Sequence, residues 1–150
     1  MIDRLLELFS PAGRRGGIAP TGELEIAVAA LLVEAARMDD HFDAAERSAV
    51  RAILARRFGL DEAATARLLA AAEEAAGRSA GLYRFVHRIT DALDADQRIG
   101  VVEMLWEVAY ADGELDPQED ALIRRIAGLV HVSDRDRGAA RLRVLSRRAG

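Results

Sequence analysis

Two stretches of the sequence place acidic residues at the same spacing, and carboxylates spaced in this way can form a metal site. Each stretch has an aspartate, a second aspartate four residues later and a glutamate three residues after that. Ca²⁺ and Mg²⁺ prefer oxygen ligands, so converging carboxylates point to a divalent cation of this kind. A glutamate also precedes each stretch, within an apolar helical pattern where a charged side chain needs a partner. The candidate ligands are Asp39, Asp43, Glu46, Asp112, Asp116, Glu119, Glu34 and Glu107.

Helix capping explains part of this pattern without any metal. Asp43 and Asp116 lie where a following helix begins, and Glu46 and Glu119 lie three residues later, which is the arrangement of a capping box. Pro117 falls at the first helical position, where proline is favoured. Four of the eight candidates therefore have a structural explanation. The metal hypothesis depends on the other four.

The EF-hand calcium loop does not fit either turn. The sixth position of such a loop would be Ala44 or Pro117 instead of glycine, and the twelfth would be Val50 or Ile123 instead of glutamate. A cation site here would therefore be of another type, and one shared between the two turns is an option.

The two acidic turns belong to an internal repeat. A shift of 73 residues places residues 34–46 over residues 107–119, and apolar positions on both sides correspond, such as Leu31 with Met104 and Val50 with Ile123. Self-similarity at a fixed offset indicates a repeated structural unit. We expect two helix–turn–helix units that pack about a pseudo-twofold axis.

The elements that position these turns are helices. Apolar residues recur at three- and four-residue steps, and alanine is common whereas aromatic residues are few. Asp94 and Gln97 have the spacing of a capping box, Gly59 is placed as a C-cap, and Ser133 is placed as the N-cap of the last helix. No stretch alternates with period two. The sequence predicts an all-α fold, a compact bundle of six to eight helices.

Composition divides the chain into two regions and indicates where in the cell the protein is expected. Residues 1–22 combine a short amphipathic helix with a linker rich in Gly and Pro, and residues 23–150 form the helical domain. The chain has no cysteine and no apolar run of about 20 residues that would span a bilayer. We expect a cytoplasmic protein without a transmembrane segment. Peripheral membrane association through residues 2–9 stays open.

Charge is distributed unevenly along the chain. Residues 1–134 hold 15 Arg and 24 acidic residues, whereas residues 135–150 hold six Arg and one Asp. A predominantly acidic body disfavours nucleic acid, because phosphate binding needs a broad positive surface. We expect the C-terminal arginines to form the solvated face of the last helix and to compensate its dipole. The alternative is that they contact an acidic protein or an anionic lipid.

No catalytic signature is present. The three histidines are scattered, no HExxH or GxSxG motif occurs, and Arg14–Gly17 lacks the lysine and spacing of a phosphate loop. We expect a protein that is not an enzyme and that has a protein partner. A hydrolase that uses paired carboxylates is the disfavoured third option.

The duplicated acidic turn, followed each time by an apolar helix, resembles the TerB-like (tellurite-resistance protein B) family. The likeness runs from about Glu23 to Leu145. It implies an all-helical bundle with pseudo-twofold symmetry, acidic turns that bind a divalent metal, and a link to tellurite resistance and stress response. The first turn departs from the family pattern, because Asp40 stands where the second turn has Gly113. A structural protein–protein interaction adaptor with no metal site is the alternative function.

Overall fold

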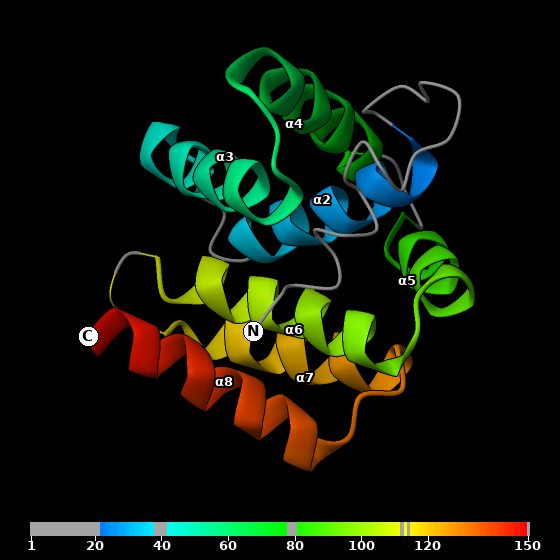
Figure 1. Ribbon diagram of the computed structural model, residues 1–150, viewed down its shortest axis with the longest axis vertical. Helices are drawn as coiled ribbons and strands as arrows, with labels where there is room; N and C mark the ends of the chain where they lie inside the picture. Colours follow the sequence, from blue (N-terminus) through cyan, green and yellow to red (C-terminus); the bar gives the residue numbers. More distant parts are fainter. Residues whose placement is uncertain (1–21, 38–41, 78–80, 112, 114, 150) are drawn as a thin grey trace.

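The computed structural model describes residues 22–37, 42–77, 81–111, 113 and 115–149 of the chain. Within these residues it contains seven α-helices and no strand, which confirms the predicted all-α bundle (Figure 1). The N-terminal segment of residues 1–21 lies outside the described residues. The helices are α2 (Glu23–Ala36), α3 (Ala44–Phe58), α4 (Glu62–Ala76), α5 (Gly81–Ala92), α6 (Ala95–Ala109), α7 (Pro117–Leu129) and α8 (Asp134–Ala149).

The internal repeat extends over three helices in each half. A shift of 73 residues carries α2, α3 and α4 onto α6, α7 and α8, with helix boundaries that agree within two residues. The contacts are reciprocal as well: α2 packs on α4 as α6 packs on α8, and α3 contacts α6 as α7 contacts α2. The two halves meet along α2 and α6. This arrangement confirms the predicted pseudo-twofold relation.

The first helix of each repeat forms the centre of the core. In α2 nearly every residue from Ala27 to Ala36 is buried, and its alanines allow neighbouring helices to approach closely. In α6 the fully buried side chains include Met104, Leu105 and Trp106. Burial of a side chain of this size stabilises the fold by about 1.5–3 kcal/mol. The acidic turns follow directly after these two buried helices, so the core fixes where each turn begins.

Capping residues set the helix ends as predicted. Asp94 Oδ1 accepts a hydrogen bond from the Gln97 amide, and Gln97 Oε1 accepts one from the Asp94 amide, both at 2.9 Å. Ser133 Oγ accepts from the Asp136 amide at 3.1 Å at the start of α8. Gly59 ends α3 with a left-handed φ of 64°. Each of these bonds satisfies a backbone group that the helix itself leaves unpaired.

The end of α7 has the same geometry as the end of α3 but lacks a glycine. His131 has φ 63°, and the Val132 amide donates to the Ala127 carbonyl at 2.8 Å, as in a Schellman motif. We expect His131→Gly to raise the free energy of unfolding by about 0.5–1 kcal/mol, because glycine adopts this region without the steric cost of a Cβ.

Chemical denaturation followed by circular dichroism measures that difference. Gly59→Ala is the matched control and should destabilise the protein, because it places a Cβ at the equivalent left-handed position of α3. A His131→Gly variant that is less stable than the wild type would contradict the prediction.

Candidate functional site

The first acidic turn leads into α3 through a capped helix start. Asp43 Oδ1 accepts a hydrogen bond from the Glu46 amide at 2.9 Å, so Asp43 is the predicted N-cap. Phe42, just before it, packs partly against the core and lies under the Arg37 guanidinium at 5.5 Å. Asp39 lies outside the described residues. Of the candidate ligands in the first turn, the structure thus describes the two capping residues, Asp43 and Glu46.

The second acidic turn has the same design with one difference. Asp116 is the N-cap of α7, but its Oδ1 accepts from the Gln118 amide at 2.7 Å and not from the amide of Glu119, the position expected for a capping box. Pro117 occupies the first helical position as predicted, and Gly113 is left-handed with φ 93°. Asp112 lies outside the described residues.

The glutamates of the two turns differ in burial. Glu119 is only 9% exposed, whereas Glu46 is partly exposed, and neither residue is without an interaction. Among the described residues, no three His, Asp or Glu side chains are grouped so that they could hold a metal ion. Since Asp39 and Asp112 are outside that set, the ligand set remains a prediction.

The two remaining candidates, Glu34 and Glu107, occupy equivalent positions but have different surroundings. Glu107 is bound by both Arg56 and Arg57 of α3, with Arg57 Nε at 2.9 Å from Oε1. The positions that correspond to Arg56 and Arg57 in the second repeat are Leu129 and Val130. Glu34 therefore has no equivalent arginine pair.

The electrostatics of Glu34 follow from this difference. Burial raises the pKa of Glu34 above its ordinary value, and the charge of Arg37 offsets only part of that rise. Among the described residues no hydrogen bond or ion pair reaches its carboxylate. Glu107, in contrast, already has its charge neutralised by arginine, which leaves it less available to a cation. Of the two equivalent glutamates, only Glu34, which precedes the first acidic turn, has no arginine bound to its carboxylate among the described residues.

A second glutamate of α6, Glu103, connects three helices. Its carboxylate accepts from Arg57 of α3 at 3.2 Å and from Arg143 and Arg147 of α8 at 2.8 and 3.1 Å. Partial burial by itself would raise the pKa of Glu103, but the hydrogen bond from Arg143 and the charges of Arg57 and Arg143 outweigh it and lower the pKa. Glu103 was not among the residues singled out from the sequence.

Comparison with known families agrees with the fold and with the repeated turns. The family described as Tellurite resistance protein TerB matches residues 25–142, which is most of the chain. The chain belongs to the TerB family. No curated protein and no solved structure gives a match.

The C-terminal helix of this TerB-family chain is built into the bundle. Arg141 donates to the Tyr110 hydroxyl at 2.7 Å and stacks over the rings of Trp106 and Tyr110 at 5.7 and 5.9 Å. The Trp106 indole N–H donates to the Arg137 carbonyl at 3.2 Å. Arg141, Arg143 and Arg147 are exposed, as expected for a solvated face of α8, but each of them also binds a partner on α6 or at its end, which the expectation did not include.

The sequence contains a spacing that is typical of the ion pairs between α6 and α8. Glu103 and Glu107 lie one helical turn apart on α6, and Arg143 and Arg147 lie one turn apart on α8. Each pair forms a short charged stripe along one side of its helix. The sequence does not say which helices face each other, so the pairing became visible only in the structure.

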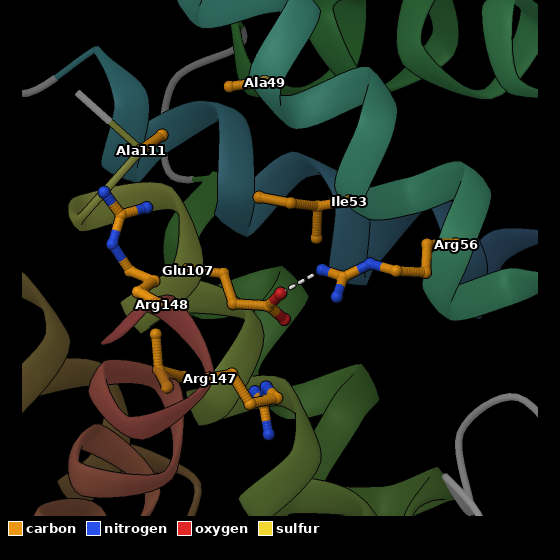
Figure 2. A pocket seen from close by; sticks show the side chains of 8 residues that line it. Ala49, Ile53, Arg56, Glu107, Ala111, Arg147 and Arg148 are labelled. Atoms are coloured by element: carbon orange, nitrogen blue, oxygen red, sulfur yellow. Dashed lines mark hydrogen bonds and ion pairs between the residues drawn. The ribbon is translucent and has the colours of Figure 1, made fainter. Parts of the chain in front are cut away.

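A pocket opens beside the ion pairs of Glu103 and Glu107 with the arginines of α3 and α8. It lies between α3, α6 and the last turns of α8 and has a volume of about 350 Å³. Figure 2 shows Glu107 between helices α3 and α8, joined to Arg56 across the opening.

Every helix in the described part of the chain is too short or too polar to span a bilayer.

Proposed function

We propose that this TerB-family module is not an enzyme and binds a divalent cation, Ca²⁺ or Mg²⁺, through its acidic turns in a tellurite or stress response. The main observation in support of the proposal is the partly buried carboxylate of Glu34. Its carboxylate is partly buried, its pKa is raised by burial, and among the described residues only Arg37 offsets its charge. A cation bound nearby would stabilise the ionised form, since an opposite charge counters the cost of burial.

Helix capping and cation binding are compatible at these turns. Asp43 and Asp116 each use one carboxylate oxygen, Oδ1, to accept a backbone N–H. An ionised carboxylate has about four lone-pair sites, so a capping aspartate retains acceptor capacity. Glu34 lies in the last turn of α2, directly before the first acidic turn. We therefore place the cation at the first turn, with Asp39 and Asp43 as ligands beside Glu34.

The role in tellurite or stress response rests on family membership alone. The family description names tellurite resistance, and no feature of the described residues identifies a tellurium ligand. The cation-binding step is therefore the part of the proposal that physical measurement tests first.

The test is thermal melting of chelator-treated protein with Ca²⁺ or Mg²⁺ added. At 100 times the dissociation constant, a ligand specific for the native state adds about 2.7 kcal/mol of stability. In a domain of this size that gain raises the melting temperature by roughly 5–10 °C. Asp39→Ala and Glu34→Gln should each remove most of the rise, and Asp112→Ala should retain it if the site is at the first turn.

Glu62→Gln is the matched control. Glu62 is exposed in the first turn of α4, outside both acidic turns, so this variant should respond to the cation as the wild type does. A melting temperature that no cation changes would remove the metal site from the proposal. That result would favour a protein–protein adaptor, for which the 65% exposed Leu142 on α8 offers an apolar contact.

A further inference from the structure

The pocket between α3, α6 and α8 is lined by arginine and by small or apolar side chains. Its charged residues are Arg56 from α3, Glu107 from α6, and Arg147 and Arg148 from α8. The rest of the wall is Ala49, Ile53, Ala111 and Val144. In Figure 2 the side chain of Arg148 extends from the end of α8 toward Ala111, and Glu107 lies between it and Arg56. Two helices that are distant in sequence, α3 and α8, thus bring guanidinium groups to one opening, and α6 adds a carboxylate.

Positive charge exceeds negative charge at this junction. Five arginines lie in or beside the pocket, counting Arg57 and Arg143 with the three in its lining, whereas the described carboxylates there are Glu103 and Glu107. The junction therefore has an excess of positive charge within a chain of net charge −4. A cleft lined by one sign of charge concentrates ions of the opposite sign.

The arginines differ in how fully they are paired. Glu103 and Glu107 account for Arg57, Arg143, Arg147 and Arg56. Arg148 has no ion pair or hydrogen bond within the described part of the chain. Each guanidinium has five N–H donors, so Arg56 and Arg147 also retain donors after binding one carboxylate. The pocket thus presents unused donors from both of its sides, α3 and α8.

We propose that this pocket binds a small multivalent oxyanion of the phosphate class, held by Arg56, Arg147 and Arg148. Guanidinium groups match the oxygens of such an anion with paired, charge-assisted hydrogen bonds. The volume of about 350 Å³ holds a phosphate group with a small substituent. The alanine, isoleucine and valine side chains of the wall exclude water on one side and strengthen the electrostatic attraction. The residues of this pocket differ from those of the cation site proposed at the first acidic turn, which are Glu34, Asp39 and Asp43.

Titration with inorganic phosphate at constant ionic strength tests the proposal. The arginine Nε–H signals in an NMR spectrum of this 16.3 kDa protein report on the pocket directly. We expect saturable shifts with phosphate and none with an equal ionic strength of sodium chloride. Arg148→Ala should weaken phosphate binding roughly tenfold or more, the effect of losing one strong charge-assisted bond. It should leave the fold intact, because Arg148 has no described partner.

Two further variants distinguish a built site from general attraction to arginine. Arg51→Ala removes an exposed arginine from α3 that is not in the pocket lining, and it should change phosphate affinity by less than about twofold. Glu107→Gln removes the competing negative charge and should strengthen binding. Equal weakening by Arg51→Ala and Arg148→Ala, or no saturable shift with phosphate, would overturn the proposal.

The phosphate group can belong to a free ion or to a lipid headgroup. Co-sedimentation with vesicles of phosphatidylcholine, with and without phosphatidic acid, separates these sources. Sedimentation that needs phosphatidic acid and is lost in Arg148→Ala assigns the pocket to a headgroup. Phosphate binding in the NMR titration without such sedimentation assigns it to a soluble oxyanion.

Discussion

Trp106→Ala is expected to lower the free energy of unfolding by about 3–5 kcal/mol, the largest loss from any single side chain considered for this protein. Trp106 is 1% exposed and lies in the C-terminal half of α6, where this helix packs on α8. Its indole N–H donates to the Arg137 carbonyl of α8, and the Arg141 guanidinium lies over its ring. The substitution therefore leaves a cavity and also weakens the attachment of α8.

Urea denaturation followed by far-ultraviolet circular dichroism measures this loss. Fluorescence is unsuitable, because Trp106 is the single tryptophan of the chain. Trp106→Phe keeps most of the ring volume and removes the N–H donor, so its smaller cost of about 1–2 kcal/mol isolates the hydrogen bond and the ring edge. Tyr83→Ala, at a 55% exposed aromatic position, should cost less than about 0.5 kcal/mol. Equal costs for Trp106→Ala and Tyr83→Ala would contradict the role assigned to Trp106.

The helices and the repeat could be predicted because their causes are local. Asp94 with Gln97, Ser133 and Gly59 each satisfy backbone groups within a few residues of themselves, so their roles follow from spacing alone. The correspondence between the two halves could also be predicted, because it depends on the same local patterns occurring twice. A 73-residue shift aligns helix starts, apolar faces and acidic residues together.

The partners of the charged side chains could not be predicted, because they depend on which helices lie side by side. Arg143 and Arg147 are solvent-exposed, as expected, and only the structure shows that both also reach Glu103 across the contact of α8 with α6. Glu107 is a predicted metal ligand because it interrupts an apolar helix, and only the structure shows the two arginines that α3 supplies to it. An isolated glutamate in a sequence signals the need for a partner and leaves the identity of the partner open.

The two repeats differ in the surroundings of the equivalent glutamates Glu34 and Glu107. In the second half α6 contacts the arginines of α3, whereas in the first half α2 faces the corresponding stretch of α7, which ends in Leu129 and Val130. The same glutamate is therefore neutralised in one repeat and left with a raised pKa in the other. The pseudo-symmetric fold in this way gives two equivalent glutamates different surroundings: Glu107 lies in an arginine-rich pocket, whereas Glu34 has no arginine pair among the described residues.

Arg57→Ala is expected to lower the free energy of unfolding by about 2–3 kcal/mol, somewhat less than the loss of a partner from a fully buried ion pair. Arg57 is 13% exposed and bridges Glu103 and Glu107, which lie one turn apart on α6 and repel each other without it. The remaining arginines, Arg56 at Glu107 and the exposed Arg143 and Arg147 at Glu103, neutralise the two carboxylates only in part. Urea denaturation at neutral pH measures the loss.

Arg56→Ala is the matched control, because Arg56 binds the same Glu107 from a 58% exposed position and should cost less than about 1 kcal/mol. The pH dependence gives a second check. The pKa of Glu103 is lowered in the folded protein, so its contribution to stability is present above the ordinary value of 4.5 and is lost as pH falls through the lower folded value. Arg57→Ala reduces that lowering, so the stability gap between variant and wild type should narrow below pH 4.5. A gap that stays constant down to acid unfolding would show that Arg57 stabilises the protein by packing alone, with no contribution from its charge.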